Sequence, residues 1–441
     1  MHALETHELA LGCMLLAALG CGGKTTRKGE ADSTGPVGEV LWTFGDEQHP
    51  LLSDPVVDRH GRIWAMIVDL SLHAGVGADH RERYLVALDS TGRELGRTPV
   101  CDPLERLLVL PRALAVGPDD DVWVACADAI ERVDFTSGVL WSAPARRLAR
   151  IPEQLGAISA DGWTYWLGSS ASSDTFQLHA LDGDGVERWV ETVGVGGPAA
   201  ETHWSSPPEI GADGTVYTSC DACIPCHVGL AAFEPKNGGY QLYEPAVPID
   251  APRDYRAVVG ANDEIAMLVT QGWTCCDSAC DCGDVTECAT PAAFVFDRQQ
   301  LRPSTAPVRL LIANDSSVAV RISTDSFPSL HFVWDGEVLP LQVGLDRPVA
   351  LADPERLIVN TQANELVVMD RSLRRLLTLE VPDFTRPLVF DGYLVTRTLG
   401  IDGNTAPLAA VRAPVKGLAA GPWPILGANQ RFTYSRDTDG P

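Results

Sequence analysis

Residues 180–189, with the sequence Ala-Leu-Asp-Gly-Asp-Gly-Val-Glu-Arg-Trp, decide the fold of this chain. An apolar strand ends at Asp182, a turn with two glycines follows, and a second strand leads to Trp189. Asp-Gly turns supply the positive φ angles that tight hairpins need. The stretch therefore predicts two antiparallel strands joined by a short turn.

A unit with two halves repeats along the body of the chain. The first half is a turn, often Asp-Gly, followed by an apolar strand. It occurs eight times, most clearly at 60–64, 120–123, 161–165 and 213–217, and more weakly at 262–265, 314–318, 353–358 and 391–394. The second half is a strand that ends in an acidic residue, as at Asp89, Asp134 and Asp182. The repeat length of roughly 40–60 residues is typical of propeller blades.

The strands of this repeat are continuously apolar, as in residues 84–88, rather than alternating. Such strands are expected where a sheet is covered on both faces, as it is between neighbouring blades. We therefore predict one all-β domain over residues 39–425, a β-propeller of eight four-stranded blades. Seven blades are the alternative.

The stretch 180–189 resembles the tryptophan-docking repeat of the PQQ-like (quinoprotein alcohol dehydrogenase-like) propeller family, and 87–92 and 133–141 are partial copies. Residues 38–42 look like the last part of a unit whose beginning is missing. The resemblance implies that this N-terminal strand completes the final blade and removes an open sheet edge. The family includes the scaffold lipoprotein of the outer-membrane barrel-assembly machine, so the resemblance implies architecture better than chemistry.

The N-terminus has features of an export signal. Residues 9–19 form an apolar run that is too short to span a bilayer but fits a signal peptide. The run leads into Ala18-Leu19-Gly20-Cys21, which resembles a bacterial lipobox, although alanine stands where leucine is usual and the leader has no Lys or Arg. An ordinary cleaved signal peptide is the alternative.

These features define the expected organisation of the chain. We expect a signal peptide with a lipobox over 1–21, lipidation of Cys21, a flexible tether over 22–38 and a C-terminal tail over 426–441. The protein would then lie at the outer membrane or another periplasm-facing part of the cell envelope. The formal net charge of −25 makes nucleic-acid binding unfavourable. We expect a monomer that contacts the membrane only through its lipid anchor.

The ten cysteines beyond Cys21 indicate an oxidising compartment. Cys101 and Cys126 predict one separate bridge in blade two, with buried free thiols as the alternative. The other eight fall in the inserts of blades four and five and predict a disulfide knot: Cys220, Cys223, Cys226, Cys275, Cys276, Cys280, Cys282 and Cys288. A zinc or iron–sulfur site is the alternative. The family resemblance implies a third possibility, a Cys275-Cys276 disulfide against PQQ with calcium.

The sequence favours binding over catalysis. It contains no H-E-x-x-H, no G-x-S-x-G and no glycine-rich phosphate loop, so we assign no catalytic residue, metal or cofactor. We expect a binding or scaffold module for an envelope protein or saccharide. A quinoprotein-type dehydrogenase or a lactonase-like hydrolase in the central channel is the alternative.

Two long inserts are the candidate partner surface, because long loops inside a compact domain are usually functional or disordered. They cover roughly 219–229 and 270–291. Their cysteines argue against disorder, and a rigid loop loses less entropy on binding. Trp273, Ile224 and Pro225 are the candidate contact residues.

Overall fold

A computed structural model gives the structure of the chain. It describes residues 35–70, 82–102, 113–126, 129–144, 156–169, 175–195, 208–211, 213–224, 227–243, 250–259, 265–273, 293–296, 301–303, 319–323, 329–334, 337–340, 346–352, 355–361, 363–382, 385–399 and 406–418. The chain divides into two units, Met1–Thr34 and Gly35–Pro441. Every described residue belongs to the second unit. Cys21 lies outside the described residues.

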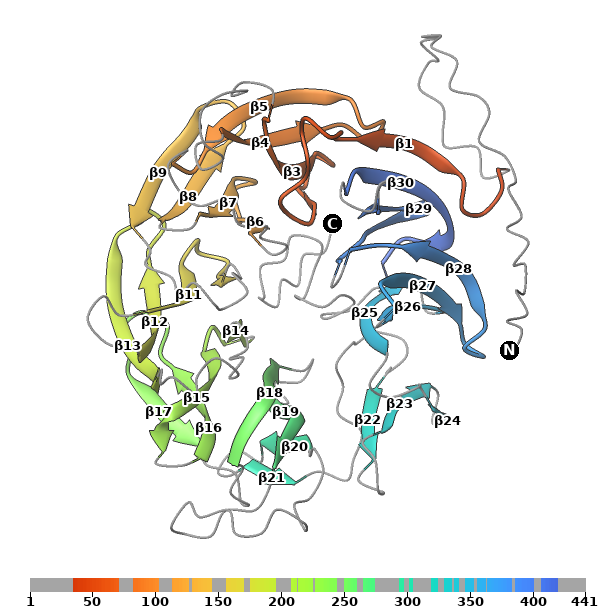
Figure 1. Cartoon of the computed structure of the whole chain (residues 1–441). Coiled ribbons are helices and arrows are strands. Elements are labelled where there is room, and N and C mark those ends of the chain that lie inside the picture. Colours follow the sequence, from red (N-terminus) through yellow and green to blue (C-terminus); the bar gives the residue numbers. More distant parts are fainter. Residues whose placement is uncertain are drawn as a thin grey trace, which may run out of the picture. The chain divides into compact units, whose positions relative to one another are not determined.

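The second unit is built from successive antiparallel sheets, which we call blades in chain order (Figure 1). Blade 1 contains β2 (Val56–Val57), β3 (Ile63–Val68), β4 (Arg83–Leu88) and β5 (Glu94–Val100). Blade 2 contains β6 (Leu114–Val116), β7 (Val122–Ala125), β8 (Ala129–Asp134) and β9 (Gly138–Pro144). Blade 3 contains β10 (Ala157–Ile158), β11 (Thr164–Ser169), β12 (Thr175–Leu181) and β13 (Glu187–Val195). Blade 4 contains β14 (Glu209–Ile210), β15 (Val216–Ile224), β16 (His227–Phe233) and β17 (Tyr240–Tyr243).

The remaining blades continue this order. Blade 5 contains β18 (Asp250–Val259), β19 (Ile265–Trp273), β20 (Ala293–Phe296) and β21 (Leu301–Pro303). Blade 6 contains β22 (Ala319–Ser323), β23 (Ser329–Trp334) and β24 (Glu337–Pro340). Blade 7 contains β25 (Asp346–Ala352), β26 (Arg356–Thr361), β27 (Glu365–Asp370) and β28 (Arg375–Glu380). The closing blade contains β29 (Leu388–Arg397), β30 (Leu408–Lys416) and β1 (Val40–Phe44).

The predicted all-β propeller fold is confirmed by this architecture. In blades 1–5 and 7 the two halves of the predicted repeat are the second and third strands, for example β3 and β4, which pair from Ile63 with Leu88 to Val68 with Arg83. Every residue of β3 is buried, as expected for a strand covered on both faces of its sheet. Blade 6 and the closing blade have three strands each within the described residues, where four were predicted.

The first strand of the unit closes the ring of sheets. β1 pairs antiparallel with β30, the last strand, through Val40 with Val411 and Phe44 with Leu408. The prediction that the N-terminal strand completes the final blade is therefore confirmed. Because the chain continues from β1 into β2 of blade 1, the hydrogen bonds between β1 and β30 tie the closing blade to the first blade.

Two turns differ from the sequence prediction. Asp391-Gly392, expected to be a turn before a strand, lies inside β29, where Gly392 has a φ of 79° and the pairing with β30 shifts register. The sequence predicted a long loop over 219–229. In the structure β15 continues through this stretch to Ile224, which pairs with His227 of β16. A hairpin satisfies backbone groups that a loop of the same length would leave to solvent.

In the blades whose hairpins the structure describes, the tight turns lie on one face of the ring. Antiparallel strands alternate in direction, so the hairpin between the first and second strands and the one between the third and fourth lie at the same edge. In blade 1 these hairpins are the turns at 58–62 and 89–93. We call the face formed by these hairpins the turn face. The hairpin between the second and third strands, such as that at Ile224, lies on the opposite face.

Candidate functional site

The ten predicted disulfide cysteines fall into three groups in the structure. Cys101 and Cys126 form a disulfide, with their Cα atoms 5.3 Å apart. Cys220 and Cys223 lie in β15, and no disulfide of theirs is described. The remaining six lie outside the described residues: Cys226, Cys275, Cys276, Cys280, Cys282 and Cys288.

The Cys101–Cys126 disulfide ties two neighbouring blades together. Cys101 follows β5, the outer strand of blade 1, and Cys126 follows β7 of blade 2. The buried carboxylate of Glu131 in β8 accepts a hydrogen bond of 3.0 Å from the backbone N–H of Cys101. The two sulfurs and this carboxylate lie within 4.8 Å of one another, a spacing compatible with a metal ion. Sulfurs joined in a disulfide are not thiolates and are not available as metal ligands. While the bridge is intact, the role of the two cysteines is to cross-link the blades.

The candidate contact residues lie at the ends of strands on the opposite face. Ile224 ends β15, and Trp273 ends β19, where it pairs with Asp250. Pro225 is outside the described residues. The pairing between β16 and the outer strand β17 ends at Leu230 with Tyr243. The β15–β16 hairpin continues beyond this pair to Ile224 and His227. Its tip therefore extends beyond the pairing with the outer strand of its own blade.

The repeated aspartates act as turn-forming residues. Oδ1 of Asp134 accepts hydrogen bonds from the hydroxyl of Thr136 at 2.6 Å, and from the backbone N–H groups of Thr136 at 2.9 Å and Ser137 at 2.7 Å. These hydrogen bonds lower the pKa of Asp134 to about 2, and the bond from the Thr136 hydroxyl has the largest effect. Burial of the carboxylate acts in the opposite direction but has a smaller effect. Asp89 and Asp370 form the same kind of turn. These carboxylates are engaged in holding hairpins.

Tryptophans at the outer strands dock onto the next blade. Trp141 Nε1 donates a hydrogen bond of 3.0 Å to the carbonyl oxygen of Gly183, and Trp189 Nε1 donates one of 2.9 Å to that of Pro235. Trp42 in β1 does the same to Ser90 of blade 1 at 3.0 Å. The three contacts link the closing blade to blade 1, blade 2 to blade 3 and blade 3 to blade 4. Packing between blades is the role that the sequence resemblance implied for these residues.

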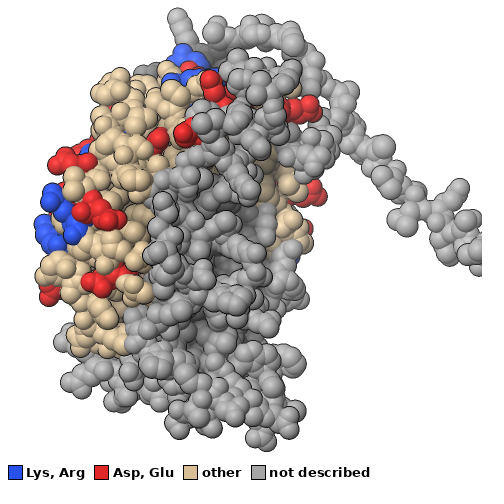
Figure 2. All heavy atoms as spheres, turned by 60° about the vertical axis from the view of Figure 1, so that its left-hand side comes forward, with Lys and Arg blue, Asp and Glu red and all other residues tan. Residues whose placement is uncertain are grey.

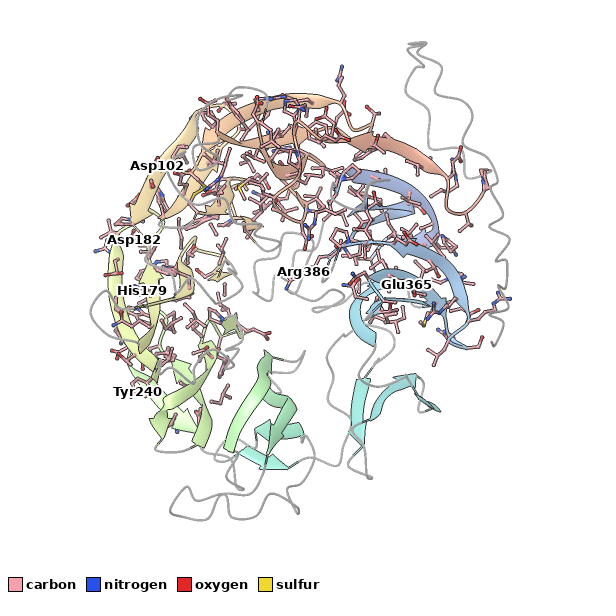
Figure 3. The ribbon with its side chains drawn as sticks, in the orientation of Figure 1. Asp102, His179, Asp182, Tyr240, Glu365 and Arg386 are labelled. Atoms are coloured by element: carbon pink, nitrogen blue, oxygen red, sulfur yellow. A yellow bond between two sulfur atoms is a disulfide. The ribbon has the colours of Figure 1, made fainter. Side chains whose placement is uncertain are left out.

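A buried ion pair joins the first and last blades. Arg397, the last residue of β29, donates from Nε to Oδ1 of Asp54 at 2.8 Å, and both side chains are 3% exposed. The backbone N–H of Arg386 donates to Oδ2 of Asp54 at 3.2 Å. Burial raises the pKa of Asp54, although both arginines act in the opposite direction. Figure 3 shows Arg386 on the inner side of the closing blade. We call Asp54, Arg386 and Arg397 the closing seam.

A partly buried histidine, His179, lies in blade 3. The ring of His179 stacks on Trp166 with centroids 4.3 Å apart, and its Nδ1 lies 2.7 Å from Oε2 of Glu187. Burial lowers the pKa of His179, and the neighbouring carboxylate opposes this in part. The histidine therefore packs as a neutral ring within the sheet at neutral pH.

Comparison with known proteins adds a likeness of fold. No family model matches the sequence, and no curated protein matches it. BamB from Moraxella catarrhalis is 14% identical, covering 82% of this chain and 85% of its own, with a TM-score of 0.37. The β-propeller domain of the Trilobed protease from Pyrococcus furiosus is 10% identical over 84% of this chain and 95% of its own, with a TM-score of 0.41. The Pan2 WD40 domain from Neurospora crassa is 8% identical over 83% and 90%, with a TM-score of 0.37. Similarity at this level says nothing about what the chain binds.

The sequence did not reveal the closing seam. Asp54 and Arg397 lie 343 positions apart, and neither belongs to the repeated motif. The nearest signal is position: Asp54 lies just before the first repeat and Arg397 in the last one. Only the closure of the ring brings the two together.

Proposed function

We propose that this chain is an exported, lipid-anchored β-propeller that serves as a binding or scaffold module of the cell envelope. The observation that carries the proposal is that the recurring aspartates and tryptophans of the repeat make structural contacts. The repeated carboxylates hold turns, as Asp134 does, and the tryptophans dock neighbouring blades, as Trp141 does. A ring braced in this way presents preformed surfaces, and a preformed surface loses little entropy on binding.

The partner surface in this proposal is the face opposite the turn face. The β15–β16 hairpin with Ile224 extends there, and the chain between β19 and β20 connects the equivalent strands of blade 5. Trp273 ends the first of those two strands. The proposed partner is an envelope protein or a saccharide.

The anchor is tested by the mass of the mature N-terminus. The expected result is a diacylglycerol-modified Cys21 at the first position, with the protein partitioning into detergent. Cys21→Ser should release the protein into the aqueous phase. Cys13→Ser makes the same change within the leader and should leave the anchored fraction unaltered. An unmodified mature terminus at another residue would contradict the anchored form.

The partner surface is tested by a variant that removes residues 274–289 and changes Cys220, Cys223 and Cys226 to Ser. We expect this variant to fold and to lose partners that the native protein retains in pull-downs from the envelope. A folded variant that keeps every partner would place the binding surface elsewhere on the ring.

A further inference from the structure

The large exposed apolar side chains of the described residues gather in one region of the repeat. They lie at or just before the start of an outer strand: Val37, Val40 and Leu41 at β1, Leu95 in β5, Val139 and Leu140 in β9, Val186 before β13, and Tyr240 in β17. Their exposed fractions run from 37% for Leu41 to 55% for Val40. Single exposed apolar residues are ordinary on a protein surface. Here exposed apolar residues recur near the start of the outer strand in five successive blades. We call these residues the apolar belt.

The apolar belt lies along the turn face. Each outer strand begins directly after the hairpin that joins it to the third strand, as β9 begins after the turn held by Asp134. Adjacent turns touch across the blades: Arg59 of blade 1 pairs with Asp120 of blade 2 at 3.0 Å, and Lys236 of blade 4 pairs with Asp161 of blade 3 at 3.0 Å. The starts of the outer strands therefore lie at the rim of one face. Figure 3 shows Tyr240 at the outer edge of blade 4.

Both ends of the described unit reach the same face. The chain enters beside Gly38, whose N–H donates a hydrogen bond of 2.9 Å to the carbonyl oxygen of Arg412 in the middle of β30. The last described residue, Leu418, forms a β-bridge with Ala352. Ala352 ends β25, directly before the first hairpin of blade 7. Val37 and Val40, close to the first described residue Gly35, thus lie on the turn-face side of β1.

Charges near the belt occur in opposite-sign pairs. Arg93 pairs with Asp89 at 3.0 Å, Arg97 pairs with Glu94 at 2.7 Å, and Arg412 pairs with Glu39 at 3.0 Å. Figure 2 shows basic and acidic side chains interspersed with uncharged ones on the described part of the side that it presents. These pairs offset locally the repulsion that a net charge of −25 would produce at an anionic surface.

We propose that the apolar belt rests on the surface of the lipid bilayer, so that the turn face is directed to the membrane and the opposite face to partners. The proposal rests on the lipid anchor of the proposed function. In the sequence, thirteen residues of the predicted tether separate Cys21 from Gly35, the first described residue. Its root-mean-square reach as a flexible chain is about 20 Å. A tether of this length holds the face from which it emerges close to the bilayer, where apolar side chains flanked by arginine and tyrosine suit the interface.

The test uses tryptophan fluorescence and zwitterionic phosphatidylcholine vesicles with brominated acyl chains. Trp42 and Trp141 directly follow the belt residues Leu41 and Leu140, so bilayer contact brings quenching bromines near them. We expect vesicle-bound wild-type protein to be quenched by brominated vesicles relative to unbrominated ones. The double variant Leu95→Asp with Leu140→Asp should remain vesicle-bound through its anchor and lose that quenching. Ser142→Asp adds the same charge to an exposed position of β9 and should keep it.

A second arm separates this proposal from the anchor itself. The full chain with Cys21→Ser and an N-terminal hexahistidine tag is held on vesicles that contain a nickel-chelating lipid and the same brominated chains. Belt-dependent quenching here supports the belt even if Cys21 is found to be unmodified. Bound protein without quenching in this arm overturns the proposal. So does a wild-type dimer in solution that the double variant converts to a monomer, since a second copy would then cover the belt.

Discussion

The indole ring of Trp141 in blade 2 lies against Gly185 in blade 3, so closely that a Cβ at residue 185 would come within 2.6 Å of the ring. Gly185 also has a φ of 76°, in the left-handed region. The glycine of one blade and the tryptophan of the blade before it therefore form a single docking contact.

Gly185→Ala should destabilise the fold by about 2–4 kcal/mol, because it combines an unfavourable φ with a clash against the docked ring. Gly61→Ala is the matched control, since Gly61 has a φ of 74° and nothing within 4 Å of its added Cβ. The control should lose only about 1 kcal/mol, the backbone part. Urea unfolding of the two variants measures the difference. Equal losses would mean that the tryptophan contact adds nothing.

Arg397→Met should cost about 3–5 kcal/mol, because it leaves the carboxylate of Asp54 buried without its charged partner. Arg93→Met is the control: its partner is Asp89, and the Arg93 side chain is 76% exposed, so its loss should be below about 1 kcal/mol. Adding Asp54→Leu to Arg397→Met should recover much of the loss, since the buried carboxylate that lost its ion-pair partner is then removed as well. Denaturant midpoints test this. A double variant as unstable as Arg397→Met would contradict it.

Asp134→Asn should reduce the acid sensitivity of the fold. The pKa of Asp134 is about 2 in the folded protein, below the unfolded value of about 3.9. Its contribution is therefore present above about pH 4 and is lost as the pH falls toward 2. The group is partly exposed, so the effect should be about 1 kcal/mol or less. Thermal midpoints measured from pH 5 to pH 2 test this, with Asp184→Asn as the control for loss of one negative charge. Equal pH slopes for wild type and Asp134→Asn would contradict it.

All ten cysteines beyond Cys21 should be paired in the exported protein, as five disulfides. Alkylation under denaturing, non-reducing conditions should label none of them. Two or more labelled cysteines, or stoichiometric zinc or iron in the purified protein, would contradict the predicted knot.

Removing the Cys101–Cys126 bridge by changing both residues to Ser should cost about 3 kcal/mol, given the 25 positions between them. Urea unfolding measures this loss. Reducing the bridge in the native protein should cause a comparable loss of stability in blades 1 and 2. Hydrogen exchange measures this local loss. Unaltered exchange in both blades after reduction would show that the bridge adds no stability there.

The strand positions could be predicted from sequence because they depend on local chemistry. An apolar run followed by Asp and Gly specifies a strand and the turn that ends it, as at residues 180–185, and related stretches recur along the chain, as at residues 84–92. The strand at Val40 could be assigned to the last blade because it is half of a unit. The β15–β16 hairpin was not predicted, because cysteine-rich stretches have no strand periodicity and pairing decides whether they continue a strand.

Local sequence was enough to establish the all-β class, the repeated hairpins and the tryptophan that each docking contact requires, since these depend on residues close together in the chain. The partners that those residues meet could be found only in the folded ring. The pair of Asp54 and Arg397 depends on closing the ring, and the common face of the apolar belt depends on how successive blades pack side by side. The sequence predicted a Cys101–Cys126 bridge, but only the structure shows that it joins blades 1 and 2. Closure of the ring sets the distances between residues of different blades. Local sequence patterns do not encode these distances, because the sequence of each blade specifies its own strands and not the residues of other blades that they contact.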